Sequence, residues 1–330
     1  MLYIYYHQDM DGKVSGATMV NLLYHYFKIQ KEDIVLYSIP DYTKILDIPE
    51  MDNDTYLIFV DYSFTNEYNL KLLEDVYKKY PKNVLWIDHH ISSIKNYEKY
   101  PFLKDIYGIR STDYCGACLS LYYANKMIVE LIKHNNFQSK ITGFGESICK
   151  LELDKHAMVD LLKHHPFYEY VDSWDTWKHT KEDDYQFMLN FSSLELVNTV
   201  DSFLDMIDYI NREYITYYMI TNGAIIEQYL KNTNKEFMES MSFSCKINGY
   251  SVICYNGRGN SKTFGDLIDK YDMCCMFYFN GTKYIYSLYS RDDGPETLHI
   301  STKMKGGGHP HASGFSTDRL ILSKDVELHI

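Results

Sequence analysis

The sequence predicts an α/β protein with two domains, and three observations support this. The length of 330 residues fits two domains of about 100–200 residues each. Over the first 90 residues, continuous apolar runs alternate with helical patterns, which predicts a mostly parallel, doubly wound sheet with helices on both faces. After Ser240 the pattern changes to short strands with Asn-Gly turns, which predicts a smaller α+β domain.

The N-terminal part is expected to alternate strands and helices. The predicted strands are short apolar runs at Leu2–Tyr6, Val35–Ile39, Tyr56–Val60 and Val84–Ile87. Four stretches are predicted as helices: Gly16–Phe27, Glu67–Tyr80, 115–133 and 153–165. A glycine-containing loop near Thr142–Gly145 is expected to join the last two helices.

A long helical tract without proline is predicted from about residue 202 to residue 240, which suits a connector between domains. Four strands are expected to follow: Phe243–Ile247, Tyr250–Tyr255, Met273–Asn280 and Lys283–Tyr289. Asn248-Gly249 and Asn280-Gly281 are predicted hairpin turns. The expected division is a first domain at 1–195, a helical connector at 196–240 and a second domain at 241–330.

Charge and cysteine content limit the classes of function. The net charge is −12, and it is unevenly spread, because residues 1–240 carry −13 and residues 241–330 carry +1. An acidic chain is poorly suited to gripping long nucleic acid, although metals and local cations can still hold a short phosphorylated ligand. Seven cysteines indicate no disulfide framework, and no apolar run is long enough to span a membrane. We therefore expect a cytoplasmic protein that does not bind membranes.

Acidic and histidine residues follow three of the predicted strands at the point where each strand ends. The segments are His7-Gln-Asp9-Met-Asp11-Gly12, Asp61, and Asp88-His89-His90. Because parallel strands end at one edge of a sheet, these side chains should converge there. A mixed oxygen and imidazole set suits Mn²⁺ or a similar divalent ion, and there are enough ligands for two ions. Asp172 and Asp175 are further candidates that could share one helix face.

These segments resemble the motifs of the DHH phosphoesterase superfamily. Gly306-Gly-Gly-His309-Pro-His311 likewise resembles the signature of its DHH-associated C-terminal domain. Among members, the chain looks most similar to the small oligoribonucleases called nanoRNases and to the phosphoadenosine phosphate phosphatases. The resemblance implies two divalent metal ions, most often Mn²⁺, with Mg²⁺ or Co²⁺ as alternatives.

The resemblance also implies a role for each matching residue. One ion would be held by His7, Asp9 and Asp61, and the second by Asp11, Asp61, His89 and Asp172. Asp88 would orient the histidines, and His90 would contact the scissile phosphate. Asp175 is the alternative to Asp172 in the fourth motif, and we expect Asp172.

Substrate contacts are expected from the second domain. Consecutive glycines let backbone N–H groups approach an anion, so Gly306, Gly307, Gly308, His309 and His311 are candidate phosphate-binding residues. The resemblance implies an arginine where this chain has Tyr289. Arg291 and Arg258 are the cations that could replace it. No individual tyrosine is predicted to act at the site.

The function expected from this resemblance is hydrolysis of very short oligonucleotides to nucleoside monophosphates. A metal-activated water would be the nucleophile. The alternatives are a 3′-phosphoadenosine 5′-phosphate phosphatase, a cyclic or linear dinucleotide phosphodiesterase, and a nucleotide-binding sensor without catalysis. The expected partner is a short oligonucleotide or nucleotide, and the oligomeric state is left open.

Overall fold

A computed structural model describes residues 1–133 and 151–330. The predicted loop at Thr142–Gly145 lies outside the described residues. The chain divides into two compact units, Met1–Ala224 and Ile225–Ile330, and the division falls within the helix α9 (Ile215–Met241). The α/β fold class is confirmed, while the expected functional division at 195 and 240 stays a prediction.

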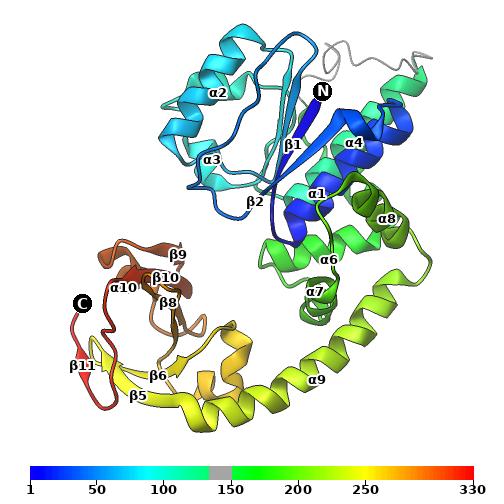
Figure 1. Ribbon diagram of the computed structural model, residues 1–330. Helices are drawn as coiled ribbons and strands as arrows, with labels where there is room; N and C mark the ends of the chain where they lie inside the picture. The colour runs from blue at the N-terminus through cyan, green and yellow to red at the C-terminus, as the bar shows by residue number, and fades with distance from the viewer. Residues whose placement is uncertain (134–150) are drawn as a thin grey trace. The chain divides into compact units, whose positions relative to one another are not determined.

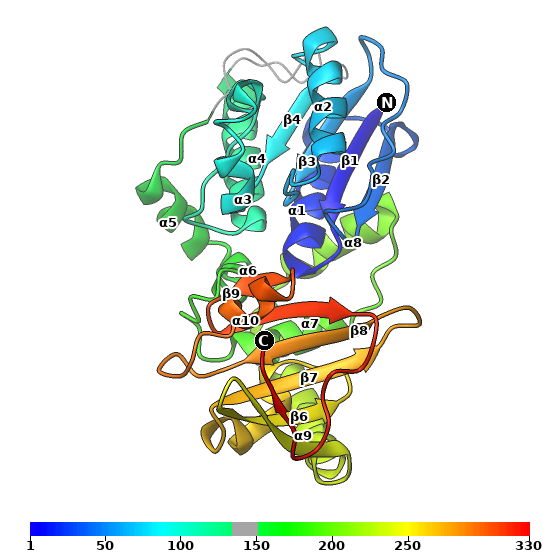
Figure 2. The same ribbon diagram turned by 90° about the vertical axis from the view of Figure 1, so that its left-hand side faces the viewer.

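The first unit is built on a four-stranded parallel sheet. Its strands are β1 (Leu2–His7), β2 (Ile34–Ile39), β3 (Tyr56–Val60) and β4 (Val84–Ile87), in the order β2-β1-β3-β4 (Figure 2). The predicted strands are therefore confirmed. Both faces of the sheet are covered, which explains why the strands are apolar throughout instead of alternating with polar residues.

Helices pack on both faces of this sheet. The helices of the first unit are α1 (Met10–Asn21), α2 (Glu67–Lys79), α3 (Ile91–Lys95), α4 (Gly116–Lys133), α5 (Lys155–Lys163), α6 (Pro166–Asp175), α7 (Asp184–Ser193) and α8 (Val200–Ile210). Figure 1 shows α2 and α3 on one side of the sheet and α1, α4 and α8 on the other. Successive side chains of a strand point to opposite faces, so Ile4 and Ile58 join one apolar core while Tyr5 and Phe59 join the other.

Three predicted features need correction. α1 begins at Met10 instead of Gly16, because the Asp9 carboxylate caps its first turn by accepting a hydrogen bond from the Gly12 N–H (2.9 Å). The predicted single connector is two helices, α8 and α9, and the chain between them includes Tyr214 in a left-handed conformation (φ 64°). The helices α6 and α7 were not predicted as elements.

The second unit contains a mixed seven-stranded sheet. Its strands are β5 (Ser242–Ile247), β6 (Tyr250–Asn256), β7 (Met273–Phe279), β8 (Tyr284–Tyr289), β9 (Gly307–His309), β10 (Ala312–Thr317) and β11 (Glu327–Leu328), in the order β11-β5-β6-β7-β8-β10-β9. The four predicted strands are present, and β9, β10 and β11 were missed. The helix α10 (Leu298–Lys303) packs through Ile300 on one face, and Met238 of α9 packs on the other.

Both predicted hairpin turns of the second unit are present, but they differ in length. Asn248 and Gly249 form a two-residue turn in which both have positive φ (50° and 85°). The second hairpin pairs Phe279 with Tyr284, so its loop extends beyond the Asn280-Gly281 pair. Within the described residues, no helix is long and apolar enough to cross a membrane.

Candidate active site

The candidate site lies at the carboxyl-terminal edge of the parallel sheet. From β1 the chain proceeds to β2 on one side, and from β3 it proceeds to β4 on the other, so the strand order reverses between β1 and β3. Ligands of doubly wound sheets bind outside the strand ends at such a switch point. The structure brings most of the predicted side chains of the first unit together at this edge.

The β1 end supplies His7, Asp9 and Asp11. His7 is the last residue of β1, and its Nδ1 lies 2.6 Å from Asp9 Oδ2. Asp11 lies in the first turn of α1 and is 1% exposed. Gly12 is required here, because a Cβ at this position would lie 2.1 Å from the His7 carbonyl oxygen. The tight approach of α1 to β1 therefore places all three side chains at the sheet edge.

Asp61 follows β3 and lies at the centre of the cluster. It is buried, and neither carboxylate oxygen has a hydrogen-bond partner among the described residues. Its backbone has the left-handed conformation (φ 49°), which is unusual for a residue other than glycine and is found disproportionately at functional sites. Buried carboxylate oxygens without a hydrogen bond are costly, so this arrangement indicates that a cation belongs there.

The β4 end supplies Asp88, His89 and His90. His90 Nδ1 lies 2.7 Å from Asp88 Oδ1, so Asp88 fixes the orientation of this ring. His89 points its Nε2 into the carboxylate cluster, 3.2 Å from Asp61 Oδ1 and 3.5 Å from Asp11 Oδ2. The two adjacent histidines thus take different positions around Asp61.

The two aspartates of α6 lie in different surroundings. Asp175 Oδ2 lies 3.4 Å from His89 Nε2, which brings Asp175 into the cluster. Asp172 instead accepts a hydrogen bond from the Cys115 backbone N–H (2.7 Å) and pairs with Lys178 (2.9 Å). We expected Asp172 in the cluster, and the structure places Asp175 there. The choice was open in the sequence because both residues follow the same pattern.

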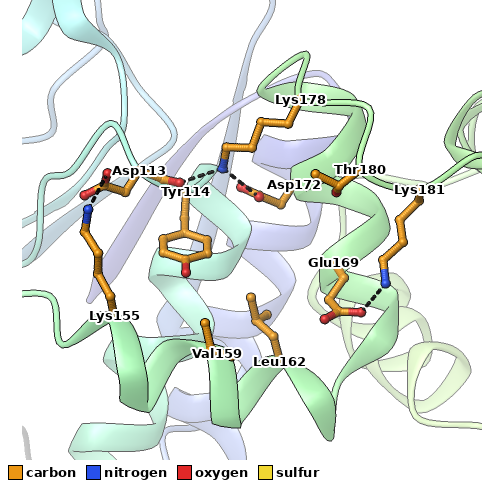
Figure 3. A pocket seen from close by; sticks show the side chains of 10 residues that line it. All are labelled: Asp113, Tyr114, Lys155, Val159, Leu162, Glu169, Asp172, Lys178, Thr180 and Lys181. Atoms are coloured by element: carbon orange, nitrogen blue, oxygen red, sulfur yellow. Dashed lines mark hydrogen bonds and ion pairs between the residues drawn. The ribbon is translucent and has the colours of Figure 1, made fainter.

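Asp172 lies at the wall of a separate pocket of about 430 Å³. Figure 3 shows three lysines around it, each next to an acidic partner. The pairs are Lys155 with Asp113, Lys178 with Asp172, and Lys181 with Glu169. These pairs neutralise the lysines and give Asp172 a structural partner.

Asp172 also lies with two thiols in a buried group that has metal-ligand spacing. Cys115 and Cys118 are fully buried at the start of α4, and burial raises the pKa of both thiols. Because thiolate and not thiol binds metal, this environment disfavours a metal there. The two cysteines instead pack at the buried start of α4.

Backbone N–H groups at the N-terminus of α4 bind the Asp11 carboxylate. The N–H of Gly116 donates to Asp11 Oδ2 (2.8 Å), and the N–H of Ala117 donates to Asp11 Oδ1 (2.6 Å). The helix dipole also stabilises a negative charge at this end. A Cβ on Gly116 would lie 2.7 Å from Asp61 Cβ, so only glycine lets α4 approach the two carboxylates this closely. Sequence reasoning missed this contribution because it comes from backbone groups.

Tyr42 is a second contact that sequence reasoning missed. Its ring stacks on His7 (centroids 4.5 Å apart), and its hydroxyl oxygen lies 3.2 Å from His90 Nε2. Tyr42 follows the end of β2, which reaches the same edge of the sheet as β1, β3 and β4. The strand-end rule applied to the other three strands would have pointed to this segment as well.

The electrostatics of the cluster favour a bound cation. Burial, together with the charges of Asp11 and Asp9, raises the pKa of Asp61 and Asp175 well above the ordinary aspartate value. Burial lowers the pKa of His89, which favours its neutral, ligating form. Burial also opposes charge on His90, but the hydrogen bond to Asp88 and the negative charges of Asp88, Asp11 and Asp9 together outweigh it and raise the pKa of His90.

The donors form three overlapping groups that could each hold an ion. They are His7, Asp9 and Asp61; Asp11, His89 and Asp175; and Asp61, His89 and His90. Within each group the ligand atoms lie within 4.8 Å of one another. Carboxylate and imidazole donors suit Mn²⁺ and related divalent ions, so the residues fit the metals that the resemblance implies.

The candidates in the second unit do not form a comparable cluster. Gly307, Gly308 and His309 belong to the exposed edge strand β9, and Gly306 directly precedes it. His311 Nδ1 lies 3.0 Å from Ser290 Oγ. Arg291 Nη1 donates to the Ile268 carbonyl oxygen (2.8 Å), which ties it to its own unit.

Arg258 is the more accessible of the two candidate arginines. It is exposed, and its guanidinium lies over the Tyr278 ring (4.9 Å to the centroid). The substrate roles expected for the residues of the second unit stay predictions.

Comparisons with known proteins agree with the fold of the first unit. Residues 1–143 match the DHH family, N-terminal domain, so the chain carries a DHH family domain at its N-terminus. No curated protein matches the chain. The DHH domain of a member of the s1p family of ribosomal proteins has a similar structure (TM-score 0.51, 11% identity, 95% of this chain and 82% of that one). This likeness shows the fold.

Two further solved structures are less similar. One is the pGpG-specific phosphodiesterase PggH from Vibrio cholerae (TM-score 0.48, 12% identity, 96% of this chain and 94% of that one). The other is RecJ in complex with Mn²⁺ from Thermus thermophilus (TM-score 0.42, 12% identity, 100% of this chain and 53% of that one).

Proposed function

We propose that this chain is a divalent-metal-dependent phosphoester hydrolase that cleaves very short oligonucleotides to nucleoside monophosphates. The observation that carries the proposal is Asp61, whose buried carboxylate oxygens lack hydrogen-bond partners among the described residues. Imidazole and carboxylate donors surround it on two sides. The DHH family domain at residues 1–143 supports the same reaction class.

Two ions would share Asp61. His7 and Asp9 would complete one ion's protein ligands, and Asp11, His89 and Asp175 would complete the other's. Mn²⁺ is the ion we expect, since the donor set mixes oxygen and imidazole nitrogen. When bound, such ions neutralise the charge on phosphate and make water nucleophilic at neutral pH.

The remaining contacts of the cluster hold His90, Asp11 and His7 in position. Asp88 holds the His90 ring through Nδ1, and Nε2, which faces the Tyr42 hydroxyl, is the atom proposed to contact a phosphate oxygen. The N-terminus of α4 fixes both oxygens of Asp11 before any ligand arrives. Tyr42 restrains His7 and His90 from one side. A prearranged set of this kind lowers the cost of reorganisation during reaction.

Short substrates suit the charge of this chain. Residues 1–240 carry a net charge of −13, so a long polyanion would be repelled outside the immediate site. In this proposal His309, His311 and the glycines beside them contribute a contact to the substrate phosphate. The compartment is proposed to be the cytoplasm.

Product analysis with the purified full-length protein and Mn²⁺ tests the proposal. The panel is a labelled RNA pentamer, a dinucleotide, 3′-phosphoadenosine 5′-phosphate, a cyclic dinucleotide and pyrophosphate, and H89A is the blank. Stepwise release of monophosphates from the pentamer, lost in H89A, is the expected result. Turnover of only the bisphosphate or the cyclic compound would overturn the substrate class, and no turnover of any compound would overturn the hydrolase.

A further inference from the structure

A pocket of about 290 Å³ adjoins the acidic cluster within the first unit. Three of its lining residues, Asp9, Asp11 and Asp175, are among the proposed metal ligands. The volume lies at the lower end of pockets that hold small molecules, which suits a single nucleotide. Neither the resemblance nor the comparisons assign a role to this pocket.

Lys13 provides the one cationic side chain of this lining. It is half-buried on α1, two residues after Asp11, and its ammonium has no hydrogen bond or ion pair with any residue in 1–133 or 151–330. The lysines of the larger pocket in Figure 3 differ, because each already contacts a carboxylate. Lys13 is therefore the lysine whose charge is available to an anion beside the acidic cluster.

The other wall of the pocket is apolar. Trp174, Met188 and Phe191 form it, and they come from α6 and α7. Trp174 is held in place by its neighbours, since its ring lies nearly parallel to those of Tyr185 (centroids 5.6 Å apart) and Trp177 (6.1 Å). Such a fixed aromatic and thioether surface accepts any nucleobase, because every base presents a flat apolar face.

We propose that this pocket binds one nucleotide of the substrate, with its phosphate between Lys13 and the acidic cluster and its base against Trp174. This inference rests on the proposed function and deepens it, because it explains how the first unit selects a nucleotide over a phosphate ester without a base. The carboxylates alone would repel a phosphate, so Lys13 and the bound cations must supply the opposing charge. The apolar wall then contributes only when a base is present.

Equilibrium binding measurements separate the contribution of Lys13 from that of Trp174. Titrating adenosine 5′-monophosphate and inorganic phosphate into the full-length protein with Mn²⁺, by calorimetry, gives two dissociation constants per variant. K13Q should weaken binding of both ligands about tenfold, because a charged hydrogen bond is lost. W174A should weaken the nucleotide about fivefold or more and leave phosphate binding unchanged, which would also show that the variant is folded.

Matched variants serve as controls. K155Q removes a lysine of the larger pocket, and Y68A removes an exposed aromatic side chain of α2 that lines neither pocket. Neither control should change either dissociation constant by more than about twofold. M188A, at the same wall as Trp174, should also weaken only the nucleotide and gives a second variant if W174A does not fold.

The outcomes are distinguishable from a failure of the proposed function. If the pentamer is hydrolysed and K13Q and W174A bind the nucleotide like the unmodified protein, the pocket inference is overturned and the hydrolase stands. If no substrate is hydrolysed and both variants still weaken nucleotide binding as expected, the pocket is supported and the hydrolase is overturned. Equal losses in K155Q or Y68A would also overturn the pocket.

Discussion

The acidic cluster of the first unit and the glycine-histidine segment of the second behave differently on folding. In the first unit, residues from three separate strand ends meet around Asp61. In the second, Gly307 and Gly308 are paired into the edge strand β9, and Arg291 is bonded to backbone carbonyl oxygens of its own unit. Parallel-sheet topology makes distant side chains converge, whereas glycine content alone does not distinguish a ligand loop from a strand.

The largest expected effect comes from removing the residue at the centre of the first region. D61N should lower hydrolysis and Mn²⁺ affinity by more than about 100-fold, because changes to residues that only support metal ligands already cost about 10–100-fold. D33N, at an exposed aspartate outside the site, is the matched control. Calorimetric titration measures the Mn²⁺ affinity of both variants, and an unchanged affinity in D61N would show that Asp61 is not a metal ligand.

A pair of variants in α6 sharpens the assignment within the cluster. D175N should weaken binding of the second Mn²⁺ about 10–100-fold, since Asp175 lies beside His89. D172N should retain both ions and lower the melting temperature, because Asp172 pairs with Lys178 and the Cys115 N–H. Metal titration and thermal unfolding of both variants test this. The opposite pattern would restore the original expectation for Asp172.

Substitutions at two glycines, Gly116 in the first unit and Gly307 in the second, test the difference between the two regions directly. G116A should lower the free energy of unfolding by about 1–3 kcal/mol and weaken Mn²⁺ binding, because its Cβ would lie 2.7 Å from Asp61 Cβ. G307A should leave stability nearly unchanged, since a Cβ there would meet nothing within 4 Å. Denaturant unfolding measures both. A G307A variant as destabilised as G116A would contradict the contrast.

The smallest effect concerns pH. Burial and neighbouring carboxylates raise the pKa of Asp61 and Asp175, so without metal the folded chain binds protons that the unfolded chain has released. Their contribution to stability therefore falls as pH rises above the ordinary aspartate value of 3.8. The metal-free melting temperature should rise from about pH 7 to about pH 5, and less steeply in D61N. Equal slopes of melting temperature against pH in D61N and the unmodified protein would show that Asp61 is not the source of this pH dependence.

The sequence predicted the parallel sheet and most of the cluster because both follow from patterns with physical causes. Apolar runs specify buried strands, and strand ends of a parallel sheet share one edge. The α4 clamp on Asp11 was not predictable, because it consists of the Gly116 and Ala117 backbone N–H groups. Asp175 could not be separated from Asp172 in sequence, because the choice depends on the Cys115 and Lys178 partners that only the fold provides.

A crystal structure with Mn²⁺, with anomalous scattering to locate the ions, tests the central claim most directly. The account predicts two ions that both contact Asp61, one also bound by His7 and Asp9 and the other by Asp11, His89 and Asp175. No ion at Asp61, or a second ion bound by Asp172 instead of Asp175, would contradict it.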